Sequence, residues 1–273
     1  MPMLARLLGL VVSVAAGLFL SLPLVTAGLA AESCPGFVAA SPPRAIPAAF
    51  GQAALQDDQV GITFVGHATF LIESPGGVRI ATDYNDFIRP AVTPDVATMN
   101  RAHATHHSYA PDPGIRHVLR GWDAPGKAAR HDLQVGDVRV RNVPTNIRDE
   151  DGGTRLYGNS IFVFETAGLC IAHLGHLHHP LEPEHLKELG RIDVVLVPVD
   201  GSWTLNLDDM ARVLAALNPP LALPMHYFGP ATLARFLDRT RERFAVTFNE
   251  TSTIVVSRTT LPTQPKIVVL PGR

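Results

Sequence analysis

Short runs of β-branched and aliphatic residues, separated by turns that contain glycine or proline, dominate the chain between residues 60 and 173. The breaks at Gly66-His67 and from Ser74 to Gly77 are typical of tight turns between strands. The pattern predicts a strand-rich first half of the domain. The expected strands occupy residues 60–65, 69–73, 78–82, 95–99, 138–143, 160–165 and 169–173.

Helical spacing of apolar residues begins only later, at residues 183–189, 208–217 and 231–244. Between these segments, the apolar runs 194–199 and 221–225 predict buried strands. Runs 254–257 and 267–270 are further strands that either extend a sheet or pair with a partner. Strands followed by alternating strands and helices predict an α/β protein with two sheets and helices outside them.

The amino-terminal segment has a different character. Residues 7–31 carry no charge, follow Arg6 and end in small residues, which predicts an export signal over residues 1–31. The same stretch is long enough to cross a bilayer, so an uncleaved membrane anchor is the alternative. Residues 32–56 form a leader rich in proline and alanine, and residues 57–273 form the folded domain. We expect this domain outside the cytoplasm, in the periplasm or tethered to the membrane.

Composition narrows the classes of partner. With 273 residues, 46% of them hydrophobic and 18% charged, the chain can bury a full core. The net charge is −2 and no run of Lys or Arg occurs, so nucleic acid is not the expected partner. A small-molecule substrate is expected, and the apolar pattern indicates no particular oligomeric state.

The chain has two cysteines, Cys34 and Cys170. Export would permit a disulfide between them. Cys170 lies within an apolar strand run, however, and Cys34 lies in the leader. We therefore expect Cys170 to be a small buried residue and do not expect the bridge.

Histidines carry the chemistry that the sequence suggests. Of twelve histidines, seven fall in two clusters, and each cluster follows an expected strand, as the single His226 does. Imidazoles would therefore project from strand ends into loops, where metal ligands are commonly presented. The clusters are His103, His106 and His107, and His173, His176, His178 and His179.

Four motifs, in order along the chain, resemble those of the metallo-β-lactamase fold. They look most like the branch of the L-ascorbate-6-phosphate lactonases and cover roughly residues 60–256. The resemblance implies a four-layer αββα sandwich whose site lies at one edge, where loops of both sheets meet, with Asp83 bracing the histidine loop. The motifs are Gly66-His-Ala-Thr-Phe-Leu-Ile-Glu73, Ala81-Thr-Asp83, Ile171-Ala-His-Leu-Gly175 and Leu223-Pro-Met-His-Tyr227.

The main ligand loop departs from the family pattern. The family's His-x-His-x-Asp-His run aligns with Arg101, His103, Thr105 and His106, so half of its ligands are missing. A guanidinium beside a dication opposes metal binding. One of the family's two metal sites is therefore expected to be empty.

The other ligand positions have changed too. His176 stands where the resemblance implies an aspartate that bridges two metals, and Asn146 or Ile147 stands where a further histidine is expected. Three neutral imidazoles with an open position form a catalytic arrangement known for zinc, and imidazole also suits iron.

We therefore predict one divalent metal, zinc in first place and iron as the alternative, held by His106, His176 and His226. His103 is a candidate fourth ligand. His173 either joins the ligands or orients one through its other ring nitrogen. The alternative is that these histidines are remnants of a lost site and hydrogen-bond one another.

Because Thr105 replaces the family's hallmark aspartate, the proton acceptor must come from elsewhere. Asp200, His103 and His67 are the candidates; His67 is expected to line the cleft, and Asp200 follows the strand run 194–199. Arg101 would suit the carboxylate or phosphate of an anionic substrate.

The leading hypothesis is a single-metal hydrolase of a small ester, lactone or phosphoester. Arg101 and Thr105 in the hallmark loop motivate an alternative, a non-catalytic envelope protein that binds a metal or a small anionic ligand in the same cleft. A third hypothesis is a mononuclear iron oxidoreductase on the same fold.

Overall fold

The computed structural model describes residues 55–149 and 151–272. The expected export segment, Cys34 and nearly all of the leader lie outside the described residues. Within the described part of the chain, no helix is long and apolar enough to cross a membrane.

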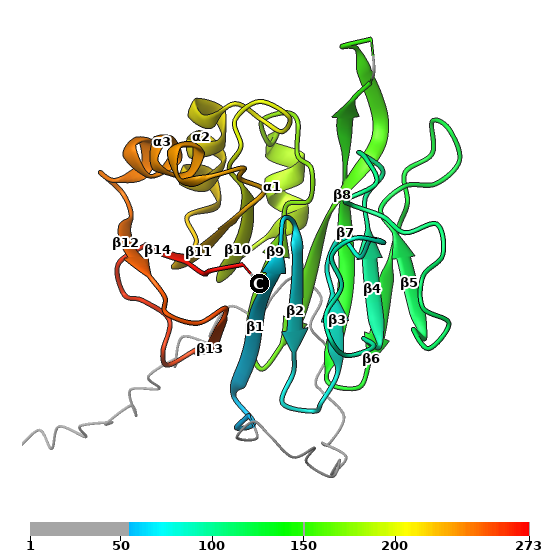
Figure 1. Ribbon diagram of the computed structural model, residues 1–273, viewed down its shortest axis with the longest axis horizontal. Coiled ribbons are helices and arrows are strands. Elements are labelled where there is room, and N and C mark those ends of the chain that lie inside the picture. Colours follow the sequence, from blue (N-terminus) through cyan, green and yellow to red (C-terminus); the bar gives the residue numbers. More distant parts are fainter. Residues whose placement is uncertain (1–54, 150, 273) are drawn as a thin grey trace, which may run out of the picture. The chain divides into compact units, whose positions relative to one another are not determined.

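A six-stranded sheet forms one layer of the domain (Figure 1), in the order β13-β1-β2-β3-β4-β5. The neighbours β13, β1, β2 and β3 pair antiparallel, whereas β3, β4 and β5 run parallel. The carboxyl ends of β1, β3, β4 and β5 therefore share one edge. The strands are β1 (Gln59–Gly66), β2 (Thr69–Glu73), β3 (Arg79–Ala81), β4 (Val96–Met99), β5 (His117–Arg120) and β13 (Thr253–Ser257).

An eight-stranded sheet forms the second layer, in the order β12-β14-β11-β10-β9-β8-β7-β6. The strands from β12 to β9 run parallel, and β8, β7 and β6 continue the sheet antiparallel. They are β6 (Asp132–Val135), β7 (Val138–Arg148), β8 (Thr154–Thr166), β9 (Leu169–His173), β10 (Val194–Pro198), β11 (Leu221–Met225), β12 (Ala245–Phe248) and β14 (Lys266–Val269).

Strand β8 lies between two cores because successive side chains of a strand point to opposite faces. Phe162 and Phe164 pack with Phe70 of β2 in the core between the sheets, whereas Ile161 and Val163 pack in a second core on the other face. All three helices contribute to this second core: α1 (Pro183–Leu189), α2 (Leu207–Leu217) and α3 (Pro230–Thr240).

The two packed sheets and the outer helices of the expected fold are confirmed. Among the described residues, however, helices cover only the eight-stranded sheet. On the outer face of the six-stranded sheet, loop residues Tyr84, Ile115 and Trp122 pack over β3 and β4 in place of the helical layer that a full αββα sandwich would add.

Most expected elements occur within one or two residues of their predicted bounds, but three strands were missed. These are β5, β6 and β12, and each is the edge strand of its sheet. Edge strands are half-solvated and carry a weaker apolar pattern; every residue of β12 is exposed.

Helix α3 also ends at Thr240 rather than at Phe244. The Thr240 hydroxyl donates to the carbonyl oxygens of Phe236 and Leu237, and the Thr240 carbonyl accepts from Arg243 and Phe244 in a closing turn. Side-chain bonds of this kind compete with regular helical bonding.

The expectation for Cys170 was half right. Its side chain is fully buried in β9, as predicted, but it is disulfide-bonded, contrary to prediction. The apolar pattern of a strand shows that a cysteine is buried, but it does not show whether its sulfur lies close enough to the protein surface to form a disulfide. Here the part-exposed guanidinium of Arg191 reaches Sγ, at 3.3 Å from Nη2.

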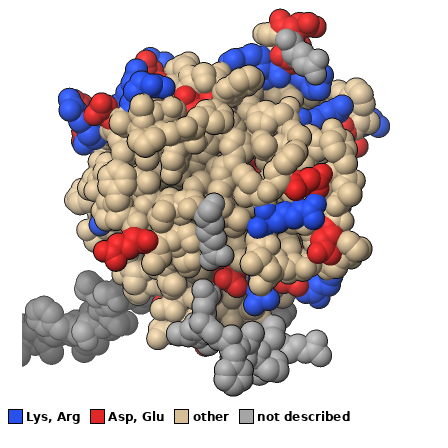
Figure 2. All heavy atoms as spheres, viewed as in Figure 1, with Lys and Arg blue, Asp and Glu red and all other residues tan. Residues whose placement is uncertain are grey.

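On the face shown in Figure 2, Lys and Arg side chains are interspersed with Asp and Glu. They do not form one continuous basic patch on that face.

Phe164→Ala tests the core between the sheets. Removing this fully buried ring should lower the free energy of unfolding by about 3–5 kcal/mol, because the lost apolar contacts leave a cavity. The matched control Phe248→Ala removes a 65% exposed ring and should change it by less than about 0.5 kcal/mol. Urea unfolding followed by circular dichroism measures both, and equal effects would refute this assignment of the core.

Candidate metal centre

The ends of three strands bring the site histidines together. His103 and His106 lie in the loop after β4, His176 lies in the loop after β9, and His226 follows β11 directly. Strand β4 belongs to one sheet and β9 and β11 to the other, so the site forms where an edge of each sheet meets.

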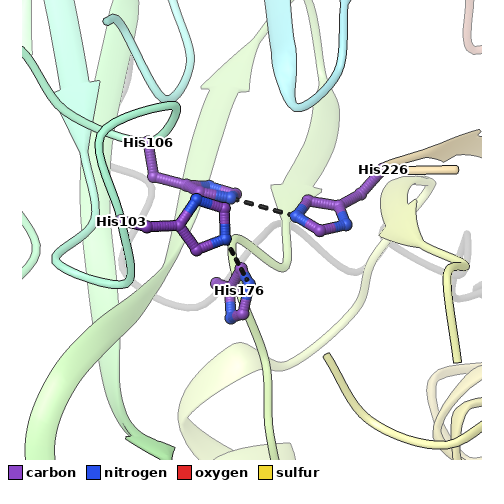
Figure 3. A group of neighbouring side chains, drawn as sticks. All are labelled: His103, His106, His176 and His226. Carbon is purple, nitrogen blue, oxygen red and sulfur yellow. Dashed lines mark hydrogen bonds between the residues drawn. The ribbon is translucent and has the colours of Figure 1, made fainter. Parts of the chain in front are cut away.

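The four imidazoles face one another (Figure 3), and one ring nitrogen of each lies within 4.8 Å of the others. His103 Nε2 lies 3.0 Å from His176 Nε2, and His106 Nε2 lies 3.1 Å from His226 Nε2. His103 is part-buried and the other three rings are buried.

The outward nitrogens also have partners. His106 Nδ1 lies 2.5 Å from Asp83 Oδ2, and His103 Nδ1 lies 2.8 Å from the Thr105 hydroxyl. His176 Nδ1 lies 2.8 Å from His178 Nε2. Metal-bound histidines commonly donate their other N–H to such partners.

The outward Nδ1 of His226 also faces a partner, but the angle between them is less favourable. Its Nδ1 lies 3.0 Å from Asp200 Oδ2, close enough for an ion pair, although the angle is too poor for a hydrogen bond. The carboxylate still places the proton of His226 on Nδ1.

This donor set fits a metal ion. Carboxylates next to Nδ1 of His106 and His226 require protons there, which leaves an unshared electron pair on each facing Nε2. Two such pairs 3.1 Å apart repel unless a cation or a proton lies between them. Burial lowers the pKa of His106 well below its usual value, with neighbouring histidines adding to the effect, so a proton is disfavoured. A dication would satisfy all four Nε2 atoms.

Neutral rings are what metal binding requires, since a protonated imidazole has no free pair. Burial, together with neighbouring histidines, also lowers the pKa of His176 and of His103. Burial raises the pKa of Asp83 to about 6, partly offset by His173 and by the hydrogen bond from Asn100. Asp83 therefore remains mostly ionised at neutral pH and braces His106, as the resemblance implied.

Backbone conformation at the site is strained. His67, Asp83 and His226 have φ values of 51°, 40° and 54°, in the left-handed region that side chains other than glycine rarely adopt. The His226 amide donates to the His67 carbonyl at 2.7 Å, which holds these two loops together. Tyr157, Ala167 and Asn218 also have positive φ values, whereas His67, Asp83 and His226 lie at the strand ends that present the cluster and its braces.

Gly175 is required beside His176. It has φ of 60°, and a Cβ there would collide with the side-chain amides of Asn100 and Asn159. The Asn159 side chain accepts from the His176 amide at 2.8 Å. The glycine therefore lets the asparagines approach closely enough to position the ligand loop.

His67 lines this centre, as expected. Its ring centroid lies 4.1 Å from that of His226, and its Nε2 lies 3.0 Å from the Thr105 hydroxyl. Burial first, and then His226 and His103, lower the pKa of His67 to about 3. This imidazole is therefore uncharged at neutral pH and a weak base.

Asp200 does not have the environment of a proton acceptor. It is buried, its Oδ1 accepts from the amides of Ser202 and Trp203, and its Oδ2 accepts from the Thr204 hydroxyl. Burial alone would raise its pKa, but the His226 imidazole at 3.0 Å and the hydrogen bond from Thr204 hold the pKa below its usual range. This environment favours a role for Asp200 in orienting His226 over the expected role of proton acceptor.

His173 lies outside the cluster. Its Nε2 donates to the Ala68 carbonyl at 2.9 Å, and its Nδ1 accepts from the Gly175 amide. Because both ring nitrogens are used, His173 is not a ligand, and it anchors the loop that carries His176. Arg101 is exposed, and its guanidinium makes no hydrogen bond or ion pair with the described residues.

Sequence reasoning missed two contributors. His178 was named only as a member of the second histidine cluster, yet it contacts His176. Thr105 was treated only as a lost ligand, yet its hydroxyl contacts both His67 and His103. The contribution of Thr105 could have been anticipated, because this residue occupies a ligand position in the hallmark loop.

Comparison with known proteins places this geometry in a family. The model of the β-lactamase superfamily domain matches residues 61–226, which include all four histidines. The chain belongs to the metallo-β-lactamase superfamily. Its expected lactonase-like branch remains a prediction.

Relatives within the superfamily are named as hydrolases. A UPF0173 metal-dependent hydrolase of Archaeoglobus fulgidus is 26% identical over 192 residues, covering 61% of this chain and 82% of its own. A solved structure from Thermotoga maritima, described as a Zn-dependent hydrolase of the superfamily, is 31% identical with a TM-score of 0.57, over 78% of this chain and all of its own. A metallo hydrolase of Ignicoccus hospitalis, 19% identical with a TM-score of 0.51, shares the fold over 79% of this chain and 97% of its own. The names of the first two support a metal-dependent hydrolase.

The lowered histidine pKa values predict that the metal-free protein loses stability in mild acid. Below a pH of about 6.5 the unfolded chain binds protons at histidines that stay unprotonated in the folded protein. The free energy of unfolding therefore falls by about 1.4 kcal/mol per pH unit for each such proton. Below about pH 6 the folded protein binds one proton at Asp83 that the unfolded chain does not bind, because folding raises the pKa of this carboxyl. This proton offsets the effect of one histidine. The histidines concerned are His67, His103, His106, His173, His176 and His178.

Urea unfolding of chelator-treated protein between pH 8 and pH 5 measures this slope. Stability should be constant above about pH 7 and should fall below it. A flat profile down to pH 5 would show that these histidines are not buried together in the folded protein.

Proposed function

We propose that this protein is a hydrolase that uses a single metal ion to cleave a small ester, lactone or phosphoester. The observation that supports this most is the inward orientation of four Nε2 atoms, each with a partner for its Nδ1. The hydrolase names of its relatives support the reaction class.

The donor set favours one ion over two. All four inward atoms are imidazole nitrogens within 4.8 Å of one another, and none is a carboxylate that could bridge a second ion. Imidazole suits zinc and iron, and zinc is the first expectation. Neutral ligands leave the full charge of the ion available to a substrate.

When bound, such an ion lowers the pKa of a water molecule to about 7 and polarises a carbonyl or phosphoryl oxygen. In the overall reaction, water adds across the acyl or phosphoryl bond and yields an acid and an alcohol. The chain's own residues have to hold the ligands in place and stabilise charge on the substrate.

Thr105 links His103 to His67 and determines their tautomers. With Nε2 of His103 unprotonated, its Nδ1–H donates to the Thr105 oxygen, at 2.8 Å. The single Thr105 hydroxyl proton then points to His67 Nε2, at 3.0 Å. His67 therefore carries its proton on Nδ1, so it serves as an uncharged hydrogen-bond donor to a substrate oxygen rather than as a base.

Arg101 lies exposed in the loop that carries His103 and His106, where it is available to a substrate carboxylate or phosphate. We further propose that the domain works outside the cytoplasm, with residues 7–31 as export signal or tether.

One observation favours the second candidate, a non-catalytic metal-binding protein. Structural zinc sites are closed by four protein ligands, and four imidazoles would fill a tetrahedron. Whether His103 binds tightly decides between the two functions, since it is the one ligand of the four that is part-exposed.

The test is hydrolysis of p-nitrophenyl acetate, γ-butyrolactone and bis-p-nitrophenyl phosphate by zinc-loaded and iron-loaded protein. We expect hydrolysis of at least one substrate, lost on chelation and restored by metal. His67→Ala should keep the metal and lower kcat by about 10²-fold, because it removes one donor to the developing charge. His117→Ala, on the edge strand β5, is the matched control and should behave as the wild type.

Bound metal without hydrolysis of any of the three substrates would favour the non-catalytic alternative. A kcat of His67→Ala equal to that of the wild type would remove the donor role of His67 and leave the reaction class intact.

A further inference from the structure

Large apolar side chains are exposed around the metal centre. The described residues expose nine of them, and five lie at the edge that carries the centre, four in loops and Leu156 in the β7–β8 hairpin. These five are between 54% and 84% exposed. We call them the apolar rim: Phe87, Tyr109, Leu156, Trp203 and Phe228.

Their sequence positions follow a pattern. Phe87 comes four residues after Asp83, Tyr109 three after His106, Trp203 three after Asp200, and Phe228 two after His226. Four of the five strand ends that supply a ligand or its carboxylate brace, all except that of β9, thus also supply an exposed aromatic residue.

Contacts show that the rim adjoins the centre. The Phe228 ring centroid lies 5.6 Å from that of His226 and 6.1 Å from that of His67. The Trp203 amide donates to Asp200 Oδ1, which fixes the turn that carries the indole.

The remaining members are held by contacts between loops. Ser108 donates to Asp86 at 2.5 Å, which joins the loops of Tyr109 and Phe87. Arg148 Nη1 lies 3.3 Å from the Ser202 carbonyl, which places the β7–β8 hairpin, with Leu156, beside the Trp203 loop.

Single exposed apolar residues are common on protein surfaces, but a gathered set marks a binding surface. Here the gathered set adjoins rings that would hold the reacting part of a substrate. Exposed aromatic rings lose little conformational entropy when they bind apolar groups, because they rotate about few bonds.

We propose that the substrate is amphipathic: a small carboxylic ester or lactone whose acyl chain or aryl group lies against Phe228 and Trp203. This proposal rests on the hydrolase function proposed above and adds the chemical class of the substrate. The ester oxygen would lie at His67 and the four histidines, and the apolar group would extend over the rim.

The first test compares kcat/KM for p-nitrophenyl octanoate and acetate with zinc-loaded wild type, Phe228→Ser and Phe248→Ser. Each added methylene should raise kcat/KM about two- to fourfold as it leaves water, so the six extra methylenes of the octanoate should give an octanoate-to-acetate ratio between about 60 and about 4000 in the wild type. The ratio should fall at least about tenfold in Phe228→Ser. It should be unchanged in Phe248→Ser, the control, whose similarly exposed ring lies on β12.

A second measurement separates this proposal from the proposed function. Calorimetry of the same three proteins with sodium octanoate and sodium acetate reports binding without hydrolysis. Octanoate should bind at least about tenfold more tightly than acetate to the wild type and to Phe248→Ser, and this difference should disappear in Phe228→Ser. Trp203→Ser repeats the comparison if Phe228→Ser does not fold by circular dichroism.

Selective octanoate binding without hydrolysis of either ester would support the rim as a binding surface and contradict the hydrolysis of carboxylic esters. Hydrolysis with a ratio near one, together with equal binding of the two carboxylates, would overturn the rim and leave the hydrolase function intact. Equal losses in Phe228→Ser and Phe248→Ser would also overturn it, because they would indicate nonspecific adsorption.

Discussion

Two unshared electron pairs, on Nε2 of His106 and of His226, face each other 3.1 Å apart inside a buried cluster of imidazoles. Asp83 and Asp200 produce this arrangement, because each carboxylate keeps the ring proton on the outer nitrogen. Left alone, the two pairs repel; with a cation between them, the same geometry becomes favourable. Much of the surrounding structure holds these two rings in position.

The strained backbone and the close-packed glycine follow from that constraint. Left-handed conformations at His67, Asp83 and His226 persist only where neighbouring structure enforces them. The bond between the His226 amide and the His67 carbonyl, and the approach of Asn100 and Asn159 to Gly175, provide this enforcement. Strained backbone is common at functional sites, and these three strained residues lie around the facing ring nitrogens of the histidines.

Much of the fold and part of the site could be predicted from the sequence. Central strands such as β8 and β9 are buried on both faces, so their apolar runs are unambiguous, whereas the solvated edge strand β12 carries no such pattern. Strand ends indicated where His106, His176 and His226 would lie. Ring orientation could not be predicted, because it depends on partners distant in sequence. The sequence left His173 open between a ligand and an orienting residue, and only its bond to the Ala68 carbonyl removes the first role. Asp200 was one of three candidate bases, and the hydrogen bonds of the turn from Asp200 to Thr204 disfavour that role.

The most direct test of this account is elemental analysis of the purified protein, prepared without chelators, alongside His106→Ala, His176→Ala, His226→Ala and the control His117→Ala. We expect close to one zinc or iron ion per chain in the wild type and the control, and a loss of at least about tenfold in metal content in each of the other three. Close to two ions per chain, or full metal content in any of those three variants, would contradict a single four-histidine centre. No stoichiometric metal even after loading with zinc and iron would contradict the metal centre itself.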